Sequence, residues 1–188
     1  MKRAGTRTLV ALTLLGAVAQ VRAQTGHAGH AGHSMGGVST GMSMQAMSRQ
    51  MVSALRPLRP HARVYAAEPE TATPFAASLA AGRASYALDW QASFVDGAGG
   101  KSVLPSMWPL LSGLLAGSIV VPLAEIRAAM RLLAERAHLI AEGAAGCAVA
   151  AALTGRAGHG KIVAVVSGGN IDLSTFASLI DACATVSA

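Results

Sequence analysis

The chain has 188 residues, enough for one domain with a buried core, and its formal net charge is +6. All nine acidic residues lie at or beyond Glu68, whereas eight of the fifteen Lys and Arg residues lie at or before Arg63, so the positive charge belongs to the N-terminal third. Only 4% of the residues are aromatic and the basic residues do not cluster with them, which argues against a nucleic-acid-binding protein.

Residues 1–23 have the three-part pattern of a secretory signal. Lys2, Arg3 and Arg7 form a positive start, the apolar stretch TLVALTLLGAVAQV is short for a membrane span, and VRA before Gln24 resembles a cleavage site. The same stretch is also compatible with a buried helix. A cleaved signal predicts a mature chain that starts near Gln24 and is periplasmic or secreted.

Residues 24–50 are rich in glycine, serine, histidine and methionine, and they show no hydrophobic periodicity, so we predict a disordered linker. Imidazole groups bind copper, nickel and zinc, and thioethers favour cuprous copper. One hypothesis is a copper-binding segment and the other is a solvated linker with incidental histidines. The composition resembles the leaders of periplasmic copper-handling proteins. The candidate metal ligands are His27, His30, His33, Met35, Met42 and Met44.

Short elements separated by turn residues are predicted from Met51 to Val121. We expect the end of a helix and a Pro-punctuated turn first, and then a strand at 63–68. A short helix at 74–81 ends at Gly82, because glycine is common just after a helix. A long loop at 89–111 and a second strand at 117–121 follow.

The C-terminal third alternates between helical and strand patterns. Apolar residues at three- and four-residue steps predict an amphipathic helix over 123–140, and a small-residue helix continues over 142–155. The apolar run KIVAVV, residues 161–166, is typical of a strand covered on both faces, as in a parallel sheet. This order of elements predicts the α/β class.

Four segments occur in one order along the chain: ALRPLRPHARVYAAEPE, SFVDGAGGKSVLPSMWPL, EIRAAMRLLAERAHLIAEGAAG and KIVAVVSGGNIDL. Together they resemble the C-terminal part of the fold-type II pyridoxal-phosphate (PLP) enzymes, the group of threonine/serine dehydratases (ammonia-lyases) and serine racemase, with a tryptophan synthase beta-like PALP domain. The resemblance covers residues 51–188. It implies an α/β fold, specifically a partial three-layer domain with a parallel sheet.

The resemblance also implies a site. Ser167 would hydrogen-bond the pyridine nitrogen of PLP, Gly168 and Gly169 would let the backbone approach the flat ring, Asn170 would pin the turn, and Glu142 would line the cofactor pocket. The implied substrate is a small hydroxy amino acid that loses water by β-elimination. Taken alone, the Ser-Gly-Gly-Asn residues are typical of an ordinary strand-to-helix turn, and Glu142 is equally compatible with a surface carboxylate at a helix end.

Two further family features map onto this chain. Glu68 and Ala72 align with a divalent-cation site, but Pro74 stands where family members offer a carboxylate, so we expect the site to be lost. A loop that contains Asp96, Gly97 and Lys101 matches a family loop near the subunit surface, and we assign it no chemistry.

The family attaches its cofactor through an early Schiff-base lysine, and this chain contains only Lys2, Lys101 and Lys161, none in the family context. The glycine-rich phosphate loop is expected near residues 42–48, where the sequence reads MSMQAMS. We therefore predict that the chain is inactive alone, and that it either needs a second chain that supplies the missing half-domain or is inert.

Two other hypotheses are an exported copper-binding protein and a truncated or fused gene product without a stable fold. The location is cytoplasmic by family and periplasmic or secreted by the leader. Cys147 lies in the small-residue helix, where a buried free thiol is expected, and it pairs with Cys183 only if the fold brings the two together.

Overall fold

A four-stranded parallel sheet forms the centre of the computed structural model, which describes residues 8–12, 53–55 and 57–181. The strands are β1 (Thr8–Leu12), β2 (Arg63–Pro69), β3 (Gly117–Val121) and β4 (Lys161–Ala164), in the order β3-β2-β1-β4. Every pairing is parallel. The predicted strands at 63–68 and 117–121 are confirmed.

β1 lies inside the apolar stretch that the sequence assigns to a secretory signal. It pairs with β2 on one side and with β4 on the other, with Val10 opposite Val64 and Val163. The alternative of a buried helix is therefore wrong for Thr8–Leu12, which is a strand. Cleavage of residues 1–23 stays a prediction, and it would remove the strand that connects β4 to the sheet.

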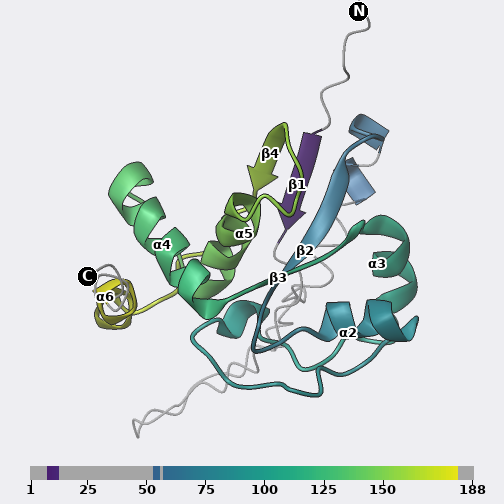
Figure 1. Cartoon of the computed structure of the whole chain (residues 1–188), viewed down its shortest axis with the longest axis horizontal. Helices are drawn as coiled ribbons and strands as arrows, with labels where there is room; N and C mark the ends of the chain where they lie inside the picture. The colour runs from purple at the N-terminus through teal and green to yellow at the C-terminus, as the bar shows by residue number, and fades with distance from the viewer. Residues whose placement is uncertain (1–7, 13–52, 56, 182–188) are drawn as a thin grey trace, which may run out of the picture.

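Helices cover both faces of the sheet and make three layers (Figure 1). The alternation of side chains along β2 explains this arrangement, because neighbouring residues of a strand point to opposite faces. Val64 and Ala66 pack with Phe75 and Leu111 in one core, whereas Ala67 belongs to the other core together with residues of β3 and the two longest helices. The predicted three-layer α/β fold is confirmed.

The first face is covered by α2 (Pro74–Ala81) and α3 (Trp108–Leu114). α2 ends at Gly82, whose φ of 64° is left-handed, as predicted for a glycine after a helix. α3 is a correction, because it begins inside the predicted loop 89–111. Leu111 of α3 is fully buried, and the rings of Phe75 and Trp108 lie 6.0 Å apart, so tertiary packing stabilises a helix in a segment rich in turn residues.

The second face is covered by α4 (Leu123–Ala137) and α5 (Gly143–Leu153). α4 is shorter than predicted and does not run on into α5, because His138 takes a left-handed conformation with φ 54° and ends the helix. The two helices pack closely: a Cβ on Gly146 would lie 2.6 Å from the Met130 side chain. The predicted close packing of the small-residue helix is confirmed, and Cys147 is buried there as a free thiol.

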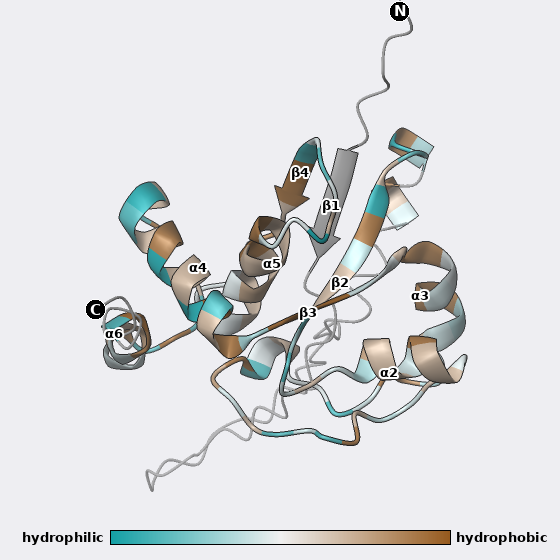
Figure 2. Ribbon diagram, in the orientation of Figure 1, coloured by the Kyte–Doolittle hydropathy of each residue, from teal (hydrophilic) through white to brown (hydrophobic). Residues whose placement is uncertain are grey.

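β4 differs from its predicted form. The strand ends at Ala164, and the side chains of Val163 and Val166 are 48% and 40% exposed, so the expectation that both faces of 161–166 are covered is wrong. Within the described residues β4 pairs only with β1, which leaves this strongly hydrophobic strand at the edge of the sheet (Figure 2). α6 (Leu173–Asp181) follows, and its Phe176 is buried.

Among residues 8–12, 53–55 and 57–181, no helix has the length and apolar character that a membrane span requires.

Candidate cofactor site

The turn formed by residues 167–170 follows the carboxyl end of β4 and lies against the segment that precedes α5. The Glu142 N–H donates a hydrogen bond of 3.2 Å to the Gly168 carbonyl. In return, the backbone N–H of Asn170 donates to the Glu142 carboxylate. The structure thus brings together Glu142 and the Ser-Gly-Gly-Asn turn, which the sequence predicts as parts of one site.

Both glycines of the turn are needed for this contact. A Cβ on Gly168 would lie 2.6 Å from Glu142 Oε1, and a Cβ on Gly169 would lie 2.5 Å from the Ile140 carbonyl oxygen. Side chains other than hydrogen would therefore push the turn away from residues 140–142. This is a different reason for glycine from the predicted approach to a flat ring, and the two reasons are compatible.

The polar groups of the turn are open to solvent. Ser167 and Asn170 are exposed, Ser167 follows β4 by three residues, and Asn170 lines the cleft beside Glu142. Asn170 pins the turn through its backbone N–H to Glu142. In parallel α/β sheets ligands bind at the carboxyl ends of the strands, which is where the 167–170 turn lies.

Glu142 is the N-cap residue of α5, but its carboxylate bonds across to the turn and makes no side-chain cap within the described residues. Burial raises the pKa of Glu142, the negative charge of Asp96 raises it further, and the Asn170 N–H lowers it. The pKa of this carboxyl is raised on balance, so a proton is held more firmly here than on an exposed glutamate.

Asp96 begins η1, a short 3-10 helix (Asp96–Ala98), and the sequence assigned no chemistry to it. The next residue, Gly97, has no room for a side chain, because a Cβ would lie 2.9 Å from Ala144 Cβ; Glu142 Oε1 would be at an ordinary contact distance of 3.6 Å. Glu142 therefore lies between two glycine-containing turns. The glycines of VDGAGG were the available signal, but their partners are distant in the sequence.

A cleft of about 310 Å³ opens between these elements. Arg127 of α4 lies over the ring of Phe94 at 5.1 Å, which holds one wall in place. The lining residues are mostly polar: Ser93, Phe94, Asp96, Glu142, Gly143, Asn170, Ile171, Asp172 and Thr175.

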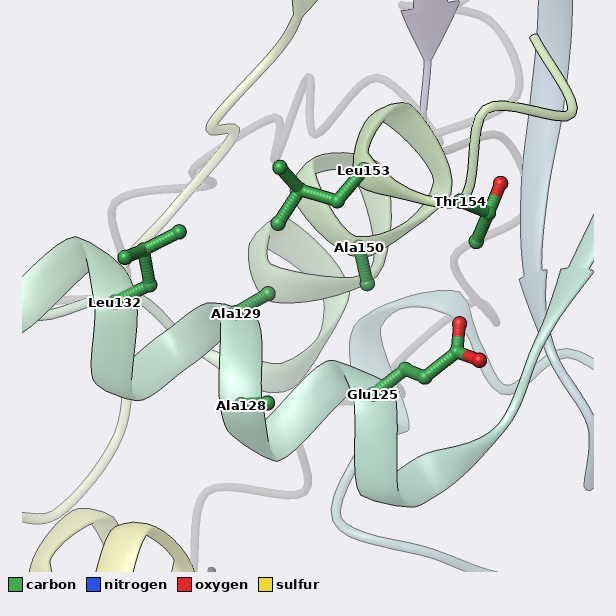
Figure 3. Close-up of a pocket in the computed structure, with 7 residues that line it drawn as sticks. All are labelled: Glu125, Ala128, Ala129, Leu132, Ala150, Leu153 and Thr154. Atoms are coloured by element: carbon green, nitrogen blue, oxygen red, sulfur yellow. The ribbon is translucent and has the colours of Figure 1, made fainter.

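A second hollow, of about 450 Å³, lies between α4 and α5 (Figure 3). Ala128, Ala129 and Leu132 line it from α4, and Ala150 and Leu153 from α5. Its wall is largely apolar and contains none of the predicted site residues, so the cleft beside Glu142 is the better candidate for a polar cofactor.

Neither of the lysines that the structure describes, Lys101 and Lys161, lines the cleft beside Glu142. Lys101 Nζ stacks over the Trp90 ring at 4.2 Å, and Lys161 begins β4 at the end opposite to Ser167. Lys2, the expected phosphate-loop residues 42–48 and all six predicted metal ligands lie outside the described residues. Within the described residues, no group of three or more His, Cys, Asp or Glu side chains is placed to hold a metal ion.

A parallel α/β sheet with a glycine turn and a polar cleft beside the carboxyl end of a strand defines a domain of the ligand-binding α/β class. The chain belongs to the family of pyridoxal-phosphate dependent enzymes, whose model matches residues 10–168. The match begins inside β1 and runs through residues 24–50, so the family likeness extends further towards the N-terminus than residue 51.

Curated relatives include a putative threonine dehydratase of Sinorhizobium fredii, 30% identical over 74% of this chain and 43% of the relative. An L-threonine ammonia-lyase of Geobacter sulfurreducens is 31% identical over 70% of this chain and 33% of the relative. Human serine racemase is 33% identical over 64% of this chain and 37% of the relative. The chain thus spans less than half the length of these relatives.

Solved structures agree with the fold. The processed form of threonine deaminase isoform 2 from Solanum lycopersicum has a TM-score of 0.69 at 18% identity, over 94% of this chain and 44% of that chain. Maize serine racemase has a TM-score of 0.67 at 24% identity, over 95% of this chain and 48% of that chain. These likenesses support a fold-type II PLP domain.

Proposed function

We propose that this chain holds the pyridine side of PLP in a threonine/serine dehydratase-like enzyme, and that it does not catalyse β-elimination of water without a lysine supplied from another segment or chain. The observation that carries the proposal is the paired hydrogen bonding of Glu142 with the 167–170 turn at the carboxyl end of β4. That arrangement leaves Ser167 exposed, and Asn170 of the same turn lines the polar cleft.

Ser167 is proposed to donate a hydrogen bond from its hydroxyl group to the pyridine nitrogen. When bound, PLP supplies the electron sink for reactions at the α-carbon of an amino acid, and a neutral hydroxyl partner leaves its ring unprotonated. Glu142 is proposed to keep the turn in place and to line the cofactor cleft. The named relatives are threonine ammonia-lyases and serine racemase, so the proposed substrate is L-threonine or L-serine.

The proposed partner is a lysine-bearing half-domain. Several large apolar residues near the turn are exposed to solvent, including Ile140 (43%), Val163 (48%) and Leu173 (72%). A second α/β unit seated here would cover them, and this burial would favour association. The same unit would bring a lysine to the cofactor, because Lys101 lies over the Trp90 ring and Lys161 begins β4 at the end opposite to Ser167.

The experiment measures 2-oxoacid formation from L-threonine and L-serine by the purified chain with PLP. We expect no rate above that of PLP alone. Addition of the lysine-bearing N-terminal part of a threonine dehydratase is expected to produce activity that Ser167→Ala reduces and Ser106→Ala, an exposed serine before α3, does not. Activity of the chain alone that is lost in Lys101→Ala or Lys161→Ala would contradict the proposal. So would an inactive mixture of two folded components.

A further inference from the structure

The Glu-Pro-Glu segment at the end of β2 is bonded to the starts of two helices. Glu70 Oε1 accepts a hydrogen bond of 2.9 Å from the backbone N–H of Leu123, the first residue of α4. Glu68 accepts hydrogen bonds from the start of α2. The residues just before these helices, Thr73 and Pro122, provide no side-chain cap in the described structure, so the two glutamates take over that role.

Glu68 is fully buried, and both of its carboxylate oxygens are bonded. Oε1 accepts from the Phe75 N–H at 2.7 Å, while Oε2 accepts from the Ala76 N–H at 2.9 Å and from the Ser118 hydroxyl at 2.5 Å. A buried carboxylate is costly unless it is hydrogen-bonded, and these three donors meet that need. The contacts join β2, α2 and β3 through one side chain.

Pro74 is the cause of this arrangement. Proline is favoured at the first turn of a helix because its φ is already helical and it has no N–H to satisfy. Pro74 begins α2, which places the N–H groups of the next two residues, Phe75 and Ala76, towards Glu68. The Pro74 carbonyl oxygen accepts from the Ser78 hydroxyl at 2.7 Å. The residue that stands in place of a metal-binding carboxylate therefore starts the helix that bonds Glu68.

We infer that Glu68, Ser118 and the N-terminus of α2 form a cation-independent anchor, which takes the place of the divalent-cation site that the family resemblance implies at Glu68 and Ala72. Magnesium and calcium require six or more oxygen ligands with free lone pairs. Here the positive ends of two N–H dipoles and one O–H dipole point at the carboxylate, and Glu70 is bonded to Leu123. These residues do not fit a divalent cation.

The test measures the thermal unfolding midpoint and the heat of binding of the full chain with Mg²⁺, Ca²⁺ or Mn²⁺, each against a sample in EDTA. The anchor predicts the same midpoint in all samples and no saturable heat. A cation that binds only to the folded state at a hundred times its Kd would instead stabilise the chain by about 2.7 kcal/mol, which raises the midpoint by several degrees.

Ser118→Ala is the matched variant, because it removes one donor from Glu68 and leaves the carboxylate in place. The anchor predicts a lower midpoint than that of the unmodified chain and still no response to cations. A saturable rise of the midpoint that disappears in Glu68→Gln would overturn the inference. A rise that persists unchanged in Glu68→Gln places the cation elsewhere and leaves the anchor intact. If Glu68→Gln does not fold, loss of the same response in Ser118→Ala overturns the inference.

Discussion

Glu68 of β2 contacts the start of α2 and Glu142 precedes α5, and both carboxyl groups are partly or fully buried, but their surroundings differ. Glu68 has no exposed surface and its two oxygens accept three hydrogen bonds from α2 and β3. Glu142 is half-buried, lines a cleft and accepts from one backbone N–H of the 167–170 turn. A buried carboxylate that accepts three hydrogen bonds serves the fold, whereas a carboxylate beside a cleft has more lone pairs available to a ligand.

The causes of the pKa shifts also differ between Glu68 and Glu142. Burial is the largest cause that raises each pKa, but the second influence differs: hydrogen bonds lower the pKa of Glu68, whereas the charge of Asp96 raises that of Glu142 further. Glu68 is therefore adapted to its pocket by bonding. Glu142 is kept next to a like charge, an arrangement that is common at functional sites.

Replacement of Glu68 or of Glu142 by alanine should produce the largest difference in the free energy of unfolding. Glu68→Ala leaves two buried N–H groups and a hydroxyl without an acceptor, which we expect to lower the free energy of unfolding by about 3 kcal/mol or more. Glu142→Ala loses one bond beside an open cleft and should cost about 1 kcal/mol. Urea unfolding of both variants measures this, and equal losses would contradict the distinction.

Substitutions of the two glycines in the 167–170 turn should produce a smaller difference in stability. A Cβ on Gly169 meets the backbone oxygen of Ile140, which has little freedom to move, so Gly169→Ala should cost about 2 kcal/mol. A Cβ on Gly168 meets the flexible end of Glu142, so Gly168→Ala should cost about 1 kcal/mol or less and displace the carboxylate instead. Thermal unfolding and PLP affinity, measured together, check this pair. A greater loss of stability in Gly168→Ala would show that Glu142 is held rigidly.

The smallest effect concerns pH. The folded-state pKa of Glu68 is raised above its ordinary value of 4.5, so the folded chain binds this proton more tightly than the unfolded chain. The resulting stabilisation is fully present below pH 4.5 and is lost as the pH rises through the raised pKa. Glu68→Gln cannot ionise, and its free energy of unfolding should therefore fall less over this range. A parallel pH profile for the two proteins, from urea unfolding at several pH values, would contradict the raised pKa.

Local patterns predicted much of this fold. The turn residues before RVYAAE and the glycine after α2 are signals carried by adjacent residues, and β2, β3 and α2 lie where they were expected. The end of α4 was missed because His138 adopts a left-handed conformation that glycine usually provides. The sequence analysis did not predict β1, because a short apolar run is compatible with a signal segment, a helix or a strand.

The site was predicted only in part, for a similar reason. The resemblance to family motifs predicted the cofactor-site residues Ser167, Gly168, Gly169, Asn170 and Glu142. The structure places Glu142 against the 167–170 turn. Other contacts join residues that are about fifty positions apart in the sequence. They are the proximity of Asp96 to Glu142 and the hydrogen bonds of Ser118 to Glu68 and of Leu123 to Glu70. Such contacts depend on how the strands are ordered in the sheet, and single-sequence patterns contain no information about that order.

Equilibrium dialysis of PLP against the unmodified chain, Ser167→Ala and Ser118→Ala tests most directly whether the 167–170 turn, and not the Glu68 region, serves a ligand. We predict saturable PLP binding. Ser167→Ala should weaken it about tenfold, because the loss of one good hydrogen bond costs about 1.4 kcal/mol. Ser118→Ala should leave the PLP affinity unchanged and lower the stability of the chain. Equal PLP affinity of the unmodified chain and Ser167→Ala would contradict the assignment of the cofactor cleft.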